Sequence, residues 1–229
     1  MVKQRERRTK LAERNLPDYT KGEEVFNMVS HIVGGGFGVV GLVLSVVLAA
    51  LRNNVTGVVA AVIFGTSLIM LYTMSAIYHG LSPRLKAKKV MQIFDHLAIF
   101  ILIAGSYTPI TLCAIVPEAA ALGWSLFGIV WGVSALGIVL NAIDLKKYAR
   151  FSMACYLGLG WCVVVSFPVL MARLPLAAIA LLLAGGVAYT VGAVLYLLGA
   201  KRRYMHSVFH VMVVIGSILH GLMIMLYVV

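Results

Sequence analysis

Charged side chains are scarce in this chain. Only 12% of its 229 residues are charged and only eight are acidic, whereas 62% are hydrophobic. The mean hydropathy is +0.99. Soluble domains carry about 25% charged residues, so this composition excludes an ordinary water-soluble domain. Cysteine is scarce too: Cys113, Cys155 and Cys162 all fall in apolar segments. We expect them to be small packing residues that form no disulfide.

Features that the sequence does not contain argue against three further classes of protein. The glycine cluster "IVGGGFGVVG" lacks the Lys-Ser/Thr of a phosphate-binding loop, so we expect its glycines to allow close helix packing. No lysine follows Lys201, which excludes a retinal Schiff base in the last apolar segment. The apolar segments are continuous runs, unlike the alternating strands of about ten residues in a transmembrane barrel.

Long apolar runs are what the sequence does contain. About 20 apolar residues in a helix cross the hydrocarbon core of a bilayer. Such runs predict seven transmembrane helices, at Val25–Leu51, Val55–His79, Met91–Val116, Ala119–Ile143, Phe151–Leu174, Pro175–Ala200 and His206–Val229. The gap at Arg173 and Pro175 is short, so six or eight helices stay open. Pro109 and Pro168 predict kinks.

We therefore expect an all-α integral membrane protein, with a basic tail over residues 1–24 and a seven-helix transmembrane domain over residues 25–229. Seventeen Lys and Arg residues lie in the tail and in the second, fourth and sixth connections, and only Arg52 and Arg173 lie elsewhere. Positive residues mark the cytoplasmic side, so the N-terminus is predicted inside and the C-terminus outside.

The net charge of +11 does not indicate a nucleic-acid partner, because the positive residues follow the predicted topology. The basic tail is expected to hold the topology and to contact anionic lipid. It is not followed by a short apolar stretch with a small-residue cleavage site, so we expect no removable signal peptide.

Ionisable residues inside the predicted helices are few, and each is a candidate for function because placing it in lipid is costly. They are Glu23, Glu24, His31, His79, Asp95, His96, His206, His210 and His220. In the predicted topology the second helix ends, and the third and seventh helices begin, in the cytoplasmic half of the membrane. His79, Asp95, His206 and His210 are therefore expected to converge at that depth.

The stretch "MHSVFH" indicates a metal site. His206 and His210 are four residues apart and thus share one helical face, as two imidazoles that bind one metal ion often do. Three neutral imidazoles with one solvent molecule are the ligand set of a catalytic zinc. Ser75 lies one turn deeper than His79. Asp95 could accept a proton from water or fix a histidine tautomer.

Two other uses of these histidines remain open, a bis-histidine haem site and a non-haem iron site that includes Asp95. The remaining histidines have weaker claims. His31 and His96 are expected near the membrane interface. His220 lies about 15 Å along the helix from His210, too deep for the same metal, and is expected to form a hydrogen bond across the bundle.

Four stretches of the sequence carry a resemblance to a known family: "EEVFNMVSH", "SAIYH", "FDHLAIFILIAGSYTP" and "HSVFH". In their order and spacing the chain resembles the bacterial hemolysin III family of the progestin and adipoQ receptor superfamily, which includes the adiponectin receptors. This resemblance implies a seven-helix bundle with an intramembrane zinc site near the cytoplasmic face. It implies His79, His206 and His210 as zinc ligands, with Asp95 holding a zinc-bound water and Ser75 beside it.

The resemblance also bears on function. Eukaryotic relatives are linked to ceramide hydrolysis, but that substrate does not carry over to a bacterial protein. The leading hypothesis is a zinc-dependent hydrolase of a lipid amide or ester in membrane lipid homeostasis. The alternatives are a non-enzymatic regulator or receptor with structural zinc, in which Asp95 binds the metal directly, and a haemolytic membrane protein. We expect membrane lipid as substrate or ligand, no nucleic-acid partner, and a location in the bacterial cell membrane.

Overall fold

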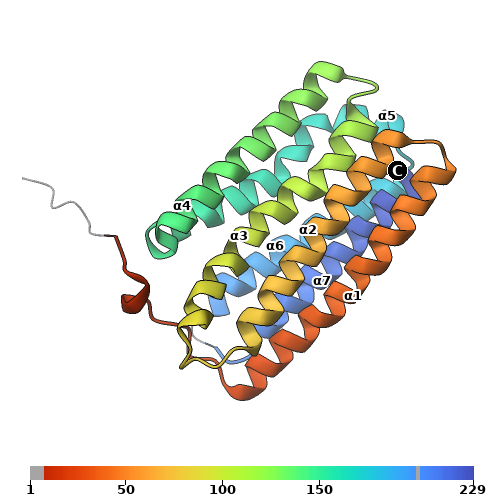
Figure 1. Ribbon diagram of the computed structural model, residues 1–229. Coiled ribbons are helices and arrows are strands. Elements are labelled where there is room, and N and C mark those ends of the chain that lie inside the picture. Colours follow the sequence, from red (N-terminus) through yellow and green to blue (C-terminus); the bar gives the residue numbers. More distant parts are fainter. Residues whose placement is uncertain (1–7, 200–201) are drawn as a thin grey trace, which may run out of the picture.

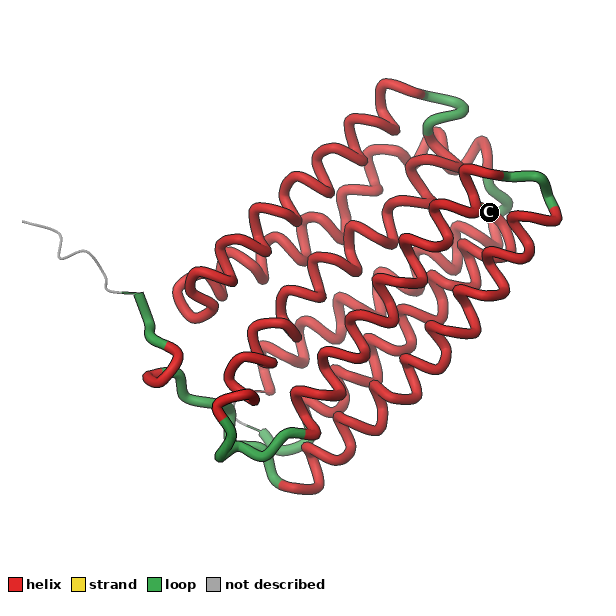
Figure 2. Tube along the Cα trace, viewed as in Figure 1, coloured by secondary structure: helices red, strands yellow, loops and turns green. Residues whose placement is uncertain are grey.

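The structure is a computed structural model that describes residues 8–199 and 202–229. The first seven residues of the predicted tail lie outside the described residues, as do Ala200, at the end of the predicted sixth helix, and Lys201. Within the described part of the chain all regular structure is helical, and the helices run side by side as one bundle (Figure 2). The prediction of an all-α protein is confirmed.

The helices follow the apolar runs of the sequence closely. A short 3₁₀ turn η1 (Leu11–Glu13) precedes α1 (Lys21–Leu51), α2 (Val55–Gly80), α3 (Lys86–Pro109), the π-helical η2 (Ile110–Ile115) and α4 (Ala120–Trp161). They are followed by η3 (Cys162–Ser166), α5 (Phe167–Arg173), α6 (Leu176–Gly199), α7 (Met205–Met223) and the π-helical η4 (Ile224–Val228). The break between Arg173 and Leu176 confirms the predicted boundary there.

Local sequence signals explain where two of the helices begin. Thr20 precedes α1, and its hydroxyl accepts a hydrogen bond from the backbone N–H of Glu23, whose carboxylate in turn accepts from the backbone N–H of Thr20. This reciprocal pair satisfies donors that a helix start leaves free. Asn54 caps α2 through its side-chain oxygen, which accepts from the backbone N–H of Gly57. Pro109, where a kink was predicted, is followed directly by the π-helical turn.

The long helix α4 is two helices joined by a sharp turn. Asp144 has non-helical backbone angles, φ −156° and ψ 97°. Its carboxylate accepts hydrogen bonds from the backbone N–H groups of Lys146 and Lys147, which caps the second half. The Ser152 hydroxyl donates to the Asn141 side chain over 2.7 Å, although a straight helix would separate these residues by about 16 Å. The two halves therefore fold back on each other (Figure 1).

Six helical segments of the described chain are long and apolar enough to cross a membrane. The sequence predicted seven. The difference lies in Ala120–Arg173, a 54-residue stretch that counts as one segment by length and composition. It covers the predicted fourth and fifth helices, and the turn at Asp144 falls in the predicted gap between them.

Interactions between distant residues define two ends of the bundle. At one end, called here the site end, the backbone N–H of Thr9 donates to Asp144 over 2.7 Å and that of Tyr204 donates to Glu23 over 2.6 Å. At the opposite end Arg173 lies 3.7 Å from Glu118. Figure 1 shows residues 8–20, called here the N-terminal segment, at the site end and the C-terminus at the opposite end.

The exposure of α1 is the reverse of that in a water-soluble helix. Its seven buried residues are small or polar, namely Glu23, Asn27, His31, Gly34, Gly38, Ser45 and Ala49. These residues recur every three, four or seven positions, so they share one face. Large apolar side chains such as Phe26 and Phe37 are exposed. A helix that buries polar groups and exposes apolar ones has lipid as its solvent, since ionisable residues in membranes face the bundle interior.

Candidate metal centre

Three histidine side chains converge at the site end. His79 stands in the last turn of α2, and His206 and His210 stand one turn apart at the start of α7. Each offers a ring nitrogen, and these nitrogens all lie within 4.8 Å of one another. His79 and His210 are almost fully buried, with 2% and 1% of their surface exposed. The sequence predicted that these three residues come together.

The arrangement of the ring nitrogens fits a metal ion. Nε2 of His206 and Nε2 of His210 face each other over 3.0 Å, and Nε2 of His79 is buried without a hydrogen-bond partner. Zinc–nitrogen bonds are about 2.0–2.1 Å long, so two nitrogens bound to one tetrahedral ion lie about 3.4 Å apart. The three nitrogens here lie within 4.8 Å of one another, about 1.4 Å more than that separation. Small side-chain adjustments would therefore let all three bind one ion.

A carboxylate fixes the orientation of His79. Nδ1 of His79 donates a hydrogen bond to Glu24 over 2.7 Å. The other oxygen of Glu24 lies 2.7 Å from Nζ of Lys88, which itself donates to the carbonyl of Leu81 over 2.9 Å. With its proton on Nδ1, the ring of His79 presents the lone pair of Nε2 to the cluster. Metal-binding histidines commonly donate their second nitrogen to a carboxylate in this way.

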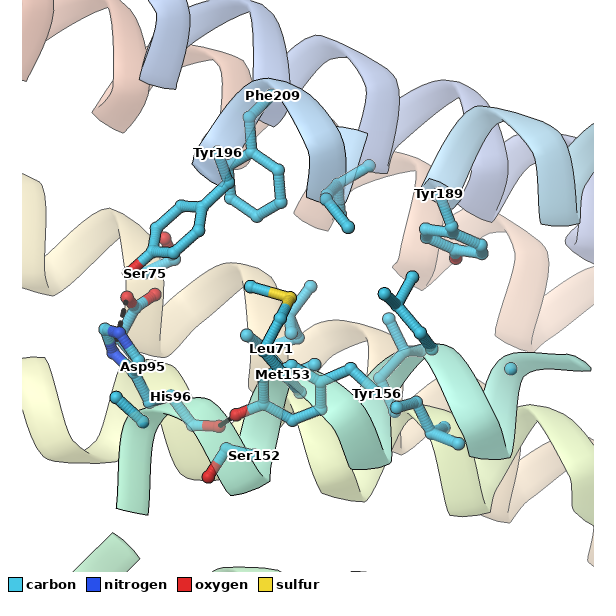
Figure 3. Close-up of a pocket in the computed structure, with 18 of the residues that line it drawn as sticks. Leu71, Ser75, Asp95, His96, Ser152, Met153, Tyr156, Tyr189, Tyr196 and Phe209 are labelled. Atoms are coloured by element: carbon cyan, nitrogen blue, oxygen red, sulfur yellow. Dashed lines mark hydrogen bonds and ion pairs between the residues drawn. The ribbon is translucent and has the colours of Figure 1, made fainter. Parts of the chain in front are cut away.

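Asp95 and Ser75 lie beside the histidines but are not part of the converging group. The Asp95 carboxylate is 3.6 Å from Nδ1 of its neighbour His96, whose ring also bonds the carbonyl of Gln92 over 2.8 Å. Ser75, one turn from His79 on α2, has a buried hydroxyl without a hydrogen-bond partner. Figure 3 shows Ser75 and Asp95 near each other at one end of a cavity.

The cavity has a volume of about 700 Å³ and is lined by residues 13–15 and by side chains from α1, α2, α3, α4, α6 and α7. Asp95, His206 and His210 line it near the site end, and Tyr189 and His220 line it farther along. Between them the walls are largely apolar, with Leu71, Leu102, Met153, Leu157 and Val213 among the lining residues. Ligand sites in proteins have this size and this mix of apolar walls with a few polar groups.

Comparison with known proteins identifies the family. A family model described as haemolysin-III related matches residues 19–221. The chain belongs to this family. It is 32% identical over 206 residues to Hemolysin-3 of Bacillus cereus, a match that covers 90% of this chain and 92% of that protein. It is 34% identical over 199 residues to the Hemolysin-3 homolog of Bacillus subtilis (strain 168), covering 87% and 91% respectively.

The predicted resemblance to the hemolysin III family is thereby confirmed. Together with the apolar helices, this membership makes the chain a multi-pass bacterial membrane protein, as the sequence predicted.

An aromatic residue of the N-terminal segment covers the histidines of this haemolysin-III related protein. The ring of Tyr19 stacks on that of His206, with centroids 4.9 Å apart and an angle of 17°, and lies 5.7 Å from His79. Burial raises the pKa of Tyr19 well above its ordinary value, so its hydroxyl stays protonated at neutral pH. The sequence analysis treated residues 1–24 only as a basic tail and missed this contact.

His31 lies in a place the sequence analysis did not expect. It was predicted near the membrane interface, but only 3% of its surface is exposed, and its ring stacks on that of His210 with centroids 3.8 Å apart. Both of its ring nitrogens are buried without hydrogen-bond partners, as are both polar atoms of the Asn27 side chain one turn earlier. The packing of α1 on α7 makes this contact, which the position of His31 in its own helix does not reveal; its predicted depth near the interface stays a prediction.

Glu24 is the other functional residue that the sequence analysis left without a role. It was named among the ionisable groups of the first helix, but its partner His79 is 55 residues away on another helix. The available signal was a carboxylate in the first turn of an apolar helix, which normally serves the helix N-terminus. Here Glu23 forms that cap, so Glu24 is available to bond His79.

His220 behaves as predicted. Its Nε2 lies 3.0 Å from the carbonyl oxygen of Leu182 on α6, to which it donates a hydrogen bond across the bundle. It takes no part in the group of three converging histidines.

Proposed function

We propose that this protein is a zinc-dependent hydrolase that cleaves an amide or ester bond of a membrane lipid, with a role in membrane lipid homeostasis. One observation carries the proposal: three histidine nitrogens converge, and two of these histidines, His206 and His210, line a largely apolar cavity of about 700 Å³ together with Asp95 and Ser75. Such a cavity suits an acyl chain, and the polar groups at its end suit a carbonyl group.

The three histidines would hold the metal. Imidazole nitrogens suit zinc, and three protein ligands leave the open position that catalytic zinc sites keep. Cys113, Cys155 and Cys162 are absent from the converging group. When bound, the ion supplies polarisation of a carbonyl group and activation of a water molecule. Glu24 keeps His79 in the tautomer that binds metal.

Asp95 acts in this proposal as the general base and acid. Its carboxylate accepts a proton from the attacking water as the new carbon–oxygen bond forms at the lipid carbonyl. It then gives the proton to the leaving amine or alcohol as the carbon–nitrogen or carbon–oxygen bond breaks. The hydroxyl of Ser75 donates a hydrogen bond to the carbonyl oxygen, where negative charge develops.

We further propose seven membrane crossings, with the site end in the cytoplasm. The Asp144 turn divides Ala120–Arg173 into two antiparallel halves, each long enough to cross a bilayer. Positive residues gather in the segments of the site end, whereas Arg52 and Arg173 lie at the opposite end, where Arg52 bonds the Val229 carbonyl. The positive-inside rule then gives a cytoplasmic N-terminus and an external C-terminus.

Reporter fusions test this topology. A reporter inserted near Lys86 is expected to report a cytoplasmic location, and one fused at Val229 an external location. A cytoplasmic signal from both fusions would contradict the seven-crossing topology and would require an even number of crossings after Lys86.

Lysis of cells is the second candidate function, because one relative is named Hemolysin-3. The cavity and the histidines have no evident part in that activity. Membranes that carry wild-type protein or the His210→Ala variant are therefore expected to lyse red cells to the same small extent. Strong lysis by both proteins, well above that of membranes that lack the protein, would favour this second candidate over hydrolysis.

The decisive experiment for hydrolysis uses Asp95→Asn, which keeps the shape of the side chain but cannot take a proton. Lipid composition is compared in a deletion strain complemented with wild type, with this variant, or with Glu118→Gln, which removes a carboxylate at the opposite end. We expect the variant to lose about 10²-fold in turnover while keeping its zinc, and Glu118→Gln to behave as wild type.

The same experiment can contradict the proposal. If Asp95→Asn loses zinc and thermal stability together, Asp95 is a direct ligand and the metal is structural, since binding free energy is then folding free energy. Identical lipid profiles in the wild-type and deletion strains would contradict hydrolysis itself.

A further inference from the structure

An arginine of the N-terminal segment is buried without a partner. Arg14 follows η1 and has only 7% of its surface exposed, and its Nε and Nη1 atoms are buried and form no hydrogen bond. Among the ion pairs of residues 8–199 and 202–229, no carboxylate pairs with it. Arginine stays charged at any physiological pH, and a buried unpaired charge costs several kcal/mol. Such a group calls for an anionic ligand.

Arg14 lines the same cavity as His206 and His210, and Thr9 of the same segment bonds Asp144. Two further cations line the cavity just after Asp144, Lys146 and Arg150, which are four residues apart and so share one face of the second half of α4. Two carboxylates also line the cavity. Glu13 is exposed and accepts from the backbone N–H of Lys10, and Asp95 lies beside His96. Neither neutralises Arg14.

We propose that Arg14, with Lys146 and Arg150, binds the oxyanion headgroup of a membrane lipid whose acyl chain occupies the cavity. A guanidinium group recognises phosphate or carboxylate oxygens through paired hydrogen bonds. The apolar walls at Leu102 and Val213 provide for the chain. The inference rests on the proposed function only where it identifies this anionic lipid as the substrate, because binding requires neither zinc nor turnover.

A tryptophan inside the cavity provides a direct measurement. Trp161 lines the cavity and donates through Nε1 to the hydroxyl of Thr190, whereas Trp124 is exposed on the outside of the bundle. Replacing Trp124 and Trp131 by Phe leaves Trp161 as the only indole of the full chain. Amphiphiles with a brominated acyl chain quench its fluorescence on entering the cavity.

The experiment compares three probes in an uncharged detergent. They are brominated lysophosphatidylglycerol, which carries a phosphate, a monoacylglycerol with the same brominated chain and no charge, and inorganic phosphate as a competitor. A charged hydrogen bond contributes about 1.5–3 kcal/mol, so half-quenching is expected at an at least tenfold lower concentration of the anionic amphiphile. Inorganic phosphate at millimolar concentration is expected to leave this quenching unchanged.

The variants assign the preference to Arg14. In Arg14→Gln we expect both amphiphiles to quench the Trp161 fluorescence at equal concentrations. Arg14→Lys keeps the charge, so we expect it to retain part of the preference for the anionic amphiphile and to show that the segment still folds. Arg84→Gln, which alters an exposed arginine between α2 and α3, is the matched control and is expected to behave as wild type.

Three results would overturn the proposal. They are equal quenching by both amphiphiles in the wild type, an unchanged preference in Arg14→Gln, and displacement of the anionic amphiphile by inorganic phosphate, which would make the site one for a free anion. The assay detects binding without hydrolysis. A negative lipid-turnover experiment therefore does not affect the result of the quenching assay. A negative quenching assay likewise does not contradict the proposed hydrolysis.

Discussion

Helix α7 carries histidines of two kinds. At its start, Nε2 of His206 and Nε2 of His210 face each other over 3.0 Å beside His79. About 15 Å farther along, Nε2 of His220 has a backbone carbonyl as its partner. His206, His210 and His220 belong to one helix and line one cavity. The partner of the nitrogen therefore separates a candidate ligand from a structural residue. A nitrogen that donates to a carbonyl oxygen carries a proton, whereas a nitrogen that binds a metal must not carry one.

The largest expected effect is on metal content. Purified wild-type protein is expected to hold about one zinc per chain, and His206→Ala or His210→Ala to lose most of it, because two remaining imidazoles bind zinc weakly. His220→Ala should retain its zinc. Elemental analysis of the three variants measures this. Equal loss from all three would show that the contrast between the two kinds of histidine does not exist.

A smaller effect on affinity is expected from Glu24→Gln. The amide still reaches His79 but no longer stabilises the proton on Nδ1 as a carboxylate does. Loss of such a carboxylate costs about 10–100-fold in metal affinity. Competition with a zinc chelator measures the affinity. Glu23→Gln is the matched control, since this neighbouring carboxylate caps α1 and accepts from the backbone N–H of Tyr204 but bonds no histidine, so its zinc affinity should stay within the error of the wild type.

The smallest effect on zinc is expected where the structural histidine packs. A Cβ atom at Gly185 would lie 2.2 Å from Cδ2 of His220, so Gly185→Ala forces that ring to move. Overpacking of this kind costs about 1–3 kcal/mol of stability. Thermal unfolding should detect the loss, while zinc content stays unchanged. Gly186→Ala, whose Cβ would lie 3.8 Å from Trp161, is the control. Loss of zinc in Gly185→Ala would show that the packing of His220 affects the metal site, contrary to the distinction drawn between the two kinds of histidine.

The sequence was sufficient for those features that depend on local spacing. The four-residue interval of His206 and His210 defines a helical face, and the apolar runs define the helices. The depth of His79 at the end of its run brought it to the same level. These predictions succeeded because a membrane helix has a fixed rise and a bilayer a fixed thickness.

The sequence was insufficient where contacts join distant segments. Tyr19 reaches His206, and Glu24 reaches His79, across separate helices. Neither pairing leaves a periodic pattern in the chain, and the polar composition of residues 8–20 resembles that of any basic tail. The sequence analysis also treated residues 144–150 as a connection, whereas the helix resumes directly after Asp144 because that side chain caps it.

The hydrogen bond between Thr9 and Asp144 has a consequence for biosynthesis. The N–H of Thr9 bonds a carboxylate 135 residues later in the chain. A ribosome adds about 5–20 residues per second, so the segment waits roughly 7–27 seconds for this partner. Tyr19 waits longer still, because His206 stands on the last helix to be made. The part of the protein that is synthesised first therefore completes its contacts last, after the helices that carry the three histidines have entered the membrane.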